Sequence, residues 1–200
     1  MIGLTLGLVS TVLAFGPLPE STMLPPGQPA PGWTNLIGTD GNRHALVDLK
    51  DKAAVVLVFF SVNCPDSLAY EDRLLGLAKD YAAKSVAVVF LNVSLWPEDN
   101  LAAMTAHAKK TKGFSVPFLF DPTQALGLSY AARATPTVFV LDQGRRIAYR
   151  GAFDDSELPD QVDKHYVRDA LDAVLAGRPV THPETEAIGC TLEYEATSPE

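Results

Sequence analysis

Cys64 is the residue whose type and position point most directly to chemistry. It follows an apolar run at residues 54–60, and Pro65 comes directly after it, at the start of a helix-like stretch over residues 65–81. Proline suits the first position of a helix, because it lacks an N–H group and its φ is already helical. Cys64 is therefore predicted to cap a helix, where the dipole and the unpaired N–H groups favour a thiolate. Cysteines so placed have pKa values lowered from about 8.5 to about 3.5–7.5, so we expect reactive sulfur chemistry, with an inert buried cysteine as the alternative.

Two polar residues in the first turn of this helix would modify the sulfur. Ser67, three positions after Cys64, can donate a hydrogen bond to a thiolate but cannot form a disulfide with it. The alternative for Ser67 is an ordinary residue of a first helical turn. Asp66 suits a helix start, yet its negative charge opposes a neighbouring thiolate and makes the expected reactivity more modest.

The elements around Cys64 alternate between apolar runs and amphipathic stretches. Near-continuous apolar runs rich in Val and Phe are typical of strands buried on both faces. The predicted elements, in chain order, are a strand at 33–37, a short segment at 44–49, strands at 54–60 and 86–93 with a helix at 65–81 between them, a helix at 97–110, an extended piece at 118–121, a helix at 124–130, a hairpin of 137–141 and 146–150, and a helix with its apolar stripe from 162 to 174 that stops at 177. This order predicts an α/β fold with a mixed central sheet flanked by helices on both faces.

The composition predicts one acidic globular domain. The chain has 200 residues, 47% of them apolar, and a formal net charge of −8. Nucleic acids and anionic membrane surfaces select for basic faces, so neither is expected as a partner, and stable membrane insertion of the domain is not expected either. The four histidines lack ligand spacing and two cysteines are too few for a structural zinc site, so no metal and no organic cofactor are expected.

The N-terminal residues predict export. Residues 1–16 are uncharged and apolar, like the apolar stretch of a secretory signal, although no Lys or Arg precedes them. The alternative is a disordered or misassigned start, and residues 18–32, with five prolines, predict an extended leader. We therefore predict a signal and leader at 1–23, a domain at 24–180 and a tail at 181–200, in a periplasmic or extracellular protein or, otherwise, a cytoplasmic one.

Three features in this order resemble the thioredoxin fold. They are the strand that ends in Cys64, the helix that starts Cys-Pro-x-Ser, and the Thr135-Pro136 pair ahead of a hairpin strand. More narrowly, the chain resembles the redoxin branch that contains alkyl hydroperoxide reductases and thiol-specific antioxidant proteins. Residues 27–33 with 38–41, and residues 140–151, are similar to segments of that family. The resemblance covers about residues 24–177 and implies a thioredoxin-like fold.

The resemblance implies a role for the Thr-Pro pair. In thioredoxin-like proteins the proline that matches Pro136 follows a cis peptide bond and lies beside the reactive sulfur. A cis X–Pro bond costs only about 0.5–1 kcal/mol and exposes the backbone of the preceding residue. The resemblance thus implies that Thr135 and Pro136 position a substrate, with the Thr135 backbone pairing as in strand addition. From position alone, an ordinary trans proline at a strand start is the alternative.

The chain departs from the peroxiredoxin pattern Pro-x-x-x-Thr-x-x-Cys with a later arginine. Ser61 matches the hydroxyl position, three residues before Cys64, and is a candidate substrate-binding residue. Leu57 stands at the proline position, the Thr-Pro pair stands at the arginine position, and Arg133 is close but out of register. These departures remove groups that orient a peroxide and stabilise its charge, which weighs against peroxidase activity.

Cys190, the second cysteine, lies in a small apolar island at residues 187–192 of an otherwise polar tail. Redoxin-like proteins often end in a similar Ile-Gly-Cys segment, which implies a tail that docks on the domain and a resolving thiol. A bond to Cys64 would close a long loop and stabilise the fold by about 4–5 kcal/mol on the chain-entropy model. A buried, inert cysteine that anchors the tail is the alternative, because cysteine spacing fixes no connectivity.

These observations leave two functional hypotheses. The first is a thiol-dependent oxidoreductase or antioxidant enzyme whose Cys64 attacks a disulfide or a peroxide, with Ser67 and Cys190 as further catalytic residues and an external thiol as reductant. The second is a non-catalytic module whose groove binds extended peptides or captures thiols. Trp33 and Trp96 are interpreted as core or loop packing residues rather than ligand platforms, and the carboxylates of residues 153–157 as a solvated loop rather than an acid/base pair. The oligomeric state is not predicted.

Overall fold

The two central strands of the sheet are the long apolar runs of the sequence. The computed structural model describes residues 24–195, and within them β3 (Ala54–Phe59) and β4 (Val86–Asn92) pair in parallel. All residues of β3 are buried, as expected for a strand that is covered on both faces. On its other side β3 pairs antiparallel with β7 (Thr137–Leu141), which forms the predicted hairpin with β8 (Ile147–Gly151).

The main sheet is mixed and has seven strands in the order β2-β1-β5-β4-β3-β7-β8, and β6 and β9 form a separate two-stranded sheet. The other elements are β1 (Leu36–Gly38), β2 (Arg43–His44), α1 (Pro65–Tyr81), α2 (Leu101–Lys110), β5 (Phe118–Phe120), α3 (Ala125–Tyr130), β6 (Ala134–Thr135), α4 (Tyr166–Leu175) and β9 (Cys190–Thr191), with 3₁₀ turns at Leu46–Leu49, Ala82–Lys84, Pro97–Asp99 and Pro159–Gln161. The α/β class with a mixed sheet is confirmed.

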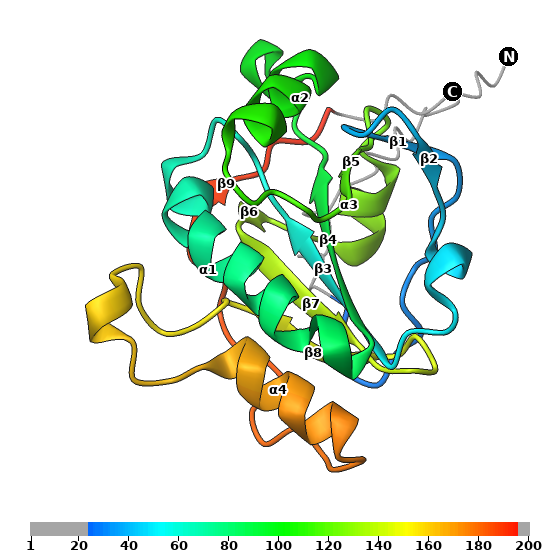
Figure 1. The fold of residues 1–200 in the computed structure, drawn as a ribbon, viewed down its shortest axis with the longest axis vertical. Helices are drawn as coiled ribbons and strands as arrows, with labels where there is room; N and C mark the ends of the chain where they lie inside the picture. The colour runs from blue at the N-terminus through cyan, green and yellow to red at the C-terminus, as the bar shows by residue number, and fades with distance from the viewer. Residues whose placement is uncertain (1–23, 196–200) are drawn as a thin grey trace, which may run out of the picture.

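Helices cover both faces of this sheet (Figure 1). On one face, Leu77 of α1 and Leu171 of α4 pack in a core cluster with Val56 of β3. On the other face, Tyr130 of α3 packs edge-on against Phe59 of β3, in a second cluster. Because alternate residues of β3 are fixed in two different cores, the carboxyl end of this strand is a rigid base for the loop that carries Cys64.

Two predicted elements begin later than the sequence pattern indicates. The first strand starts at Leu36, because Asn35 adopts a left-handed conformation with φ 61° that interrupts the extended backbone. The helix expected from residue 97 is first a 3₁₀ turn, and α2 starts at Leu101. Asn100 sets this start, because its side chain accepts a hydrogen bond from the N–H of Ala103 at 2.9 Å and caps the helix.

The last helix also begins later, at Tyr166 rather than near Val162. The carboxylate of Asp155 accepts hydrogen bonds from the N–H groups of Asp163 and Lys164, at 3.0 and 2.9 Å. These bonds hold the preceding residues in a loop, so the apolar side chain of Val162 precedes the helix instead of extending its stripe.

The two tryptophans differ in their surroundings. Trp33 is buried in the core cluster on the α3 face of the sheet, as its interpretation as a packing residue predicts. Trp96, whose residue surface is 53% exposed, lies on the loop after β4. No helix among residues 24–195 is long and apolar enough to cross a membrane. The predicted signal segment at residues 1–16 lies outside the described residues.

Candidate active site

Cys64 lies at the end of the loop that joins β3 to α1, and it caps the helix as the sequence predicts. Its backbone is extended, Pro65 takes the first helical position, and its Sγ accepts a hydrogen bond from the N–H of Ser67 at 3.3 Å. The residue is only 2% exposed. The N–H group and the helix dipole therefore stabilise negative charge on a sulfur that the surrounding protein largely shields from water.

Cys190 forms a disulfide with Cys64 across 126 positions of sequence. The Cα atoms of the two residues are 5.9 Å apart, within the range that a disulfide spans without backbone movement. The chain has two cysteines, so this bond uses all of its thiols. Of the two alternatives that the sequence left open for Cys190, the structure contains the paired one.

Backbone pairing holds the tail against the Thr-Pro turn. β9 pairs antiparallel with β6, with Cys190 opposite Thr135, and the N–H of Leu192 donates to the carbonyl of Arg133 at 2.8 Å. Gly189 permits this approach, because a Cβ at that position would lie 2.7 Å from the carbonyl carbon of Thr135. Figure 1 shows the red end of the described chain beside β6 and the start of α1. The tail is thus a structured part of the site.

The peptide bond between Thr135 and Pro136 is cis, as the resemblance implies. The carbonyl oxygen of Thr135 lies 3.1 Å from Cys64 Sγ. A disulfide sulfur carries no proton, so this is a contact here, and a reduced thiol can donate a hydrogen bond at the same distance. The backbone edge that the sequence assigned to a substrate is occupied in this state by the chain's own Cys190.

The hydroxyl of Ser61 is hydrogen-bonded to Asp99. It donates to the Asp99 carboxylate, with oxygens at 2.8 and 3.0 Å, and both residues are buried. The N–H of Asn63 also donates to this carboxylate, at 3.2 Å, so Asp99 braces the loop that leads to Cys64. The sequence analysis missed Asp99. It lies 38 positions from Ser61, and no local pattern links the two residues.

Ser67 acts on Cys64 through its backbone N–H. Its side chain is fully buried, and its hydroxyl accepts a hydrogen bond from the N–H of Ser61 at 3.4 Å. The hydroxyl therefore fastens the end of β3 to the first turn of α1. The predicted hydroxyl bond to the sulfur is not among the bonds of this oxidised state.

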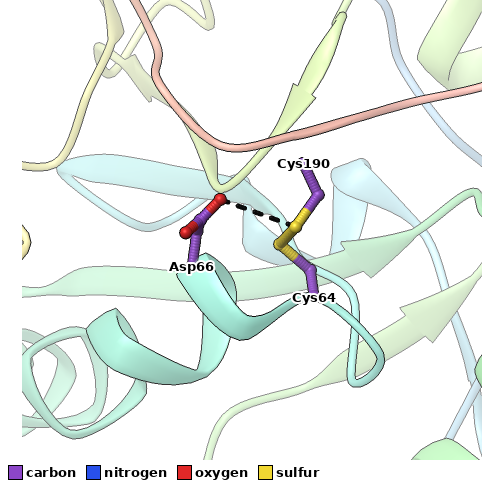
Figure 2. Close-up of side chains that lie close together, drawn as sticks. All are labelled: Cys64, Asp66 and Cys190. Carbon is purple, nitrogen blue, oxygen red and sulfur yellow. Dashed lines mark hydrogen bonds between the residues drawn. A yellow bond between two sulfur atoms is a disulfide. The ribbon is translucent and has the colours of Figure 1, made fainter.

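Asp66 lies beside the disulfide. Figure 2 shows its side chain pointing toward the sulfurs, and its Oδ2 is 3.5 Å from Cys190 Sγ. The sequence analysis considered the charge of Asp66 only in relation to Cys64. The structure shows that this carboxylate also lies close to Cys190, the cysteine of the tail. A reduced Cys190 thiol can donate to this carboxylate at that distance.

Two cavities flank the disulfide. The smaller, about 160 Å³, is lined by both cysteines and by Trp96. Its charged lining residues, among those the structure describes, are the acidic Asp99 and Glu193, and no lysine or arginine is among them. The larger, about 430 Å³, begins at Asp66 and Pro136 and runs along the loop after β8.

Asp154, which lines the larger cavity, is buried and forms an ion pair with the partly buried Arg73 of α1. Arg73 donates to the Asp154 carboxylate at 2.6 Å, and also to the carbonyls of Ser156 and Glu157. Burial raises the pKa of Asp154, although the charge of Arg73 opposes this shift. The expectation of a solvated loop is therefore wrong for Asp154, which is 3% exposed. It holds for Asp155, whose pKa is lowered by the hydrogen bond from the N–H of Lys164.

Comparison with protein families gives one match over most of the chain. The family model named Redoxin matches residues 25–166. No curated protein matches the sequence.

Solved structures give similar chains of nearly the same extent. A hypothetical protein, SMc02350, from Sinorhizobium meliloti 1021 is 32% identical, with a TM-score of 0.80 over 88% of this chain and 97% of that one. An uncharacterized conserved protein from Geobacillus kaustophilus is 34% identical, with a TM-score of 0.81 over 88% and 95%. The exposed lipoprotein thioredoxin from Streptococcus pneumoniae strain TIGR4 is 22% identical, with a TM-score of 0.57 over 74% and 99%. This last likeness concerns the fold alone and confirms that the fold is thioredoxin-like.

Proposed function

Because the chain belongs to the redoxin family, we propose that it is a thiol–disulfide oxidoreductase in which Cys64 is the nucleophile and Cys190 the resolving thiol. The observation that carries this proposal is the Cys64–Cys190 disulfide at the N-terminus of α1, beside the cis Thr135–Pro136 bond. A sulfur that accepts an N–H bond at a helix start is a suitable attacking and leaving thiolate.

The proposed reaction consumes one substrate disulfide and oxidises the pair of cysteines. The Cys64 thiolate attacks one substrate sulfur, the substrate S–S bond breaks, and a thiolate leaves with the electron pair of that bond. Cys190 then attacks the Cys64 sulfur of the mixed disulfide and releases the second substrate thiol. The substrate gains two electrons and two protons, and the protein ends in the disulfide state of this structure. An external dithiol returns it to the reduced state.

The surroundings of Cys64 favour a disulfide over a peroxide as substrate. A peroxide needs donors that orient it and stabilise the charge that develops on its leaving oxygen. The Ser61 hydroxyl, which stands at the position of such a donor, instead donates its hydrogen bond to the Asp99 carboxylate. The cavity at the sulfurs also presents carboxylates of Asp99 and Glu193. Negative groups do not assist a leaving alkoxide or hydroxide.

Trapping of the mixed disulfide tests the proposed function. Reduced Cys190→Ser protein, given a peptide that contains a disulfide, is expected to accumulate a Cys64–peptide adduct on non-reducing mass analysis. Wild-type protein should instead release both peptide thiols and form Cys64–Cys190. Cys64→Ser is the matched control, with one thiol left at the other position, and should give no turnover.

Absence of the adduct in the Cys190→Ser variant would sink the assignment. If hydrogen peroxide oxidises reduced wild-type protein faster than the disulfide peptide does, and Cys190→Ser then holds a Cys64 sulfenic acid, the substrate is a peroxide instead. Adduct formation without release of peptide thiols from wild-type protein would identify a capture module.

We also propose that the protein works in an oxidising compartment. The apolar residues 1–16 agree with export. Cell fractionation, with the mass of the mature protein, tests this: recovery of the full-length chain in the cytosol would contradict it.

A further inference from the structure

The disulfide and Asp66 form a compact group of three metal-ligand side chains (Figure 2). One ligand atom from each of Cys64, Asp66 and Cys190 lies within 4.8 Å of the other two. Two of these residues are fixed by the first turn of α1, and the third is fixed by the pairing of β9 with β6. Reduction therefore leaves two thiols and a carboxylate facing one another.

Reduction also concentrates negative charge at this place. Two electrons and two protons convert the disulfide to two thiols, and loss of those protons gives thiolates beside the Asp66 carboxylate. The charged residues that line the cavity beside the two cysteines, Asp99 and Glu193, are also acidic. Asp66 Oδ2 lies 3.5 Å from Cys190 Sγ, and like charges at that distance destabilise one another, so a bound cation would remove the repulsion.

We propose that the reduced protein binds one Zn²⁺ through the sulfurs of Cys64 and Cys190 and a carboxylate oxygen of Asp66. Zn²⁺ accepts thiolate and carboxylate ligands together, whereas Mg²⁺ and Ca²⁺ take oxygen ligands and Cu⁺ selects sulfur. Bond lengths of about 2.3 Å to sulfur and about 2.1 Å to oxygen put tetrahedral ligand atoms roughly 3.6–3.8 Å apart. Asp66 Oδ2 and Cys190 Sγ, 3.5 Å apart, are already near this spacing, and the two sulfurs, bonded at 2.27 Å in the oxidised state, reach it by moving apart after reduction.

The site has room for an open fourth position. The cavity of about 160 Å³ at the two sulfurs accommodates a water molecule or a small ligand there. Three protein ligands with one open position is an arrangement that zinc adopts in proteins. The sequence predicted no metal, because the two cysteines lie 126 positions apart, and it is the docking of the tail beside Asp66 that assembles the ligand set.

Metal binding and the disulfide exclude each other. Binding forms two Zn–S bonds and one Zn–O bond, releases the two thiol protons to solvent and transfers no electron. The oxidised protein cannot bind in this way, because its sulfurs are bonded to each other and carry no charge. Zn²⁺ therefore keeps the tail docked after reduction and withdraws Cys64 from attack on a substrate.

Titration of the full chain in its two redox states tests the site without any variant. The protein is reduced with a phosphine, freed of reductant in the absence of oxygen, and titrated with Zn²⁺ by calorimetry. Co²⁺ reports tetrahedral thiolate coordination by its visible absorption. We expect one ion per chain in the reduced protein, loss of this binding in the oxidised protein, and slower alkylation of both cysteines when Zn²⁺ is present.

Two carboxylate variants of reduced protein identify the third ligand. Loss of a residue that only supports a ligand costs about 10–100-fold in metal affinity, so Asp66→Asn should weaken Zn²⁺ binding by at least about tenfold. Glu186→Gln is the matched control: this exposed carboxylate lines the neighbouring cavity and should keep the wild-type affinity.

Three results would each overturn the proposal: equal binding by the oxidised chain, unchanged affinity in Asp66→Asn, or one ion shared by two chains. The zinc site and the proposed function fail separately, because disulfide exchange is measured without metal and Zn²⁺ binding without a disulfide substrate.

Discussion

Gly189→Ala should make the Cys64–Cys190 disulfide easier to reduce. Gly189 precedes Cys190, where the tail passes over the Thr-Pro turn. An added Cβ would overlap the Thr135 carbonyl and would lie 3.1 Å from the nitrogen of Pro136. Both neighbours are backbone atoms, so they cannot rotate away as a flexible side chain would.

The cost of this overlap falls mainly on the oxidised state. Forcing an extra methyl group into a packed site costs about 1–3 kcal/mol. In the reduced protein the tail can shift away from Thr135, because non-covalent contacts alone hold it. In the oxidised protein the bond keeps the two cysteine Cα atoms 5.9 Å apart. Since about 30 mV corresponds to 1.4 kcal/mol for two electrons, we expect the reduction potential to rise by roughly 20–65 mV.

The potential is measured by equilibrating the protein in buffers with different ratios of reduced to oxidised glutathione. Each sample is then quenched in acid and alkylated, and its redox state is determined by mass spectrometry. Gly76→Ala, on α1, is the matched control, because a Cβ there meets nothing within 4 Å and the potential should stay unchanged. A potential of Gly189→Ala equal to that of wild type would refute the reasoning. It would mean that the tail keeps the same docked position after reduction, or that the Thr-Pro turn yields.

Three further predictions concern stability and connectivity. Reduction of the disulfide should lower the free energy of unfolding in urea by about 4–5 kcal/mol, because the bond closes a loop of 126 positions, and a difference near zero would contradict the chain-entropy argument. Ser67→Cys should give a bond between Cys64 and the introduced thiol on non-reducing peptide mapping, because Ser67 lies one helical turn from Cys64, and retention of Cys64–Cys190 alone would show that the first turn cannot accommodate it. Burial and a hydrogen bond to Asp172 raise the pKa of Tyr81 from 10.0 to about 12. Its contribution to stability is therefore present below pH 10 and lost as pH rises through about 12, and Tyr81→Phe should flatten this part of the stability profile.

Local signals explain what the sequence predicted of this site. The helix that starts at Pro65 was predicted with both of its observed ends, since proline, the capping cysteine and apolar spacing all indicate the same boundaries. The central strands were predicted because a strand buried on both faces needs an unbroken apolar run. The cis bond before Pro136 came only from the family resemblance, since a Thr-Pro pair by itself fits a trans bond equally well.

Contacts between distant segments explain what the sequence could not predict. The hydrogen bond between Ser61 and Asp99 depends on how the 3₁₀ turn after β4 packs near the end of β3. No sequence pattern around either residue predicts this contact. The pairing of β9 with β6 involves two strands of two residues each, too short for periodicity to be visible. Nothing in the sequence indicated that Gly189 packs against the backbone of Thr135, because a glycine in a polar tail normally predicts a flexible backbone rather than a close backbone contact.

On the proposed function, the position of the tail links the redox state of the protein to the access of a substrate. Cys190 and the residues beside it pair with the backbone of residues 133–135, the edge that a peptide would use for strand addition. While the disulfide is intact, the tail cannot leave this edge, so a peptide cannot pair there. Reduction thus has two consequences at once: it regenerates the Cys64 thiol and it allows the edge to open. On the proposed function, a substrate peptide and Cys190 then compete for the same backbone groups, and return of Cys190 to this edge both resolves the mixed disulfide and displaces the product.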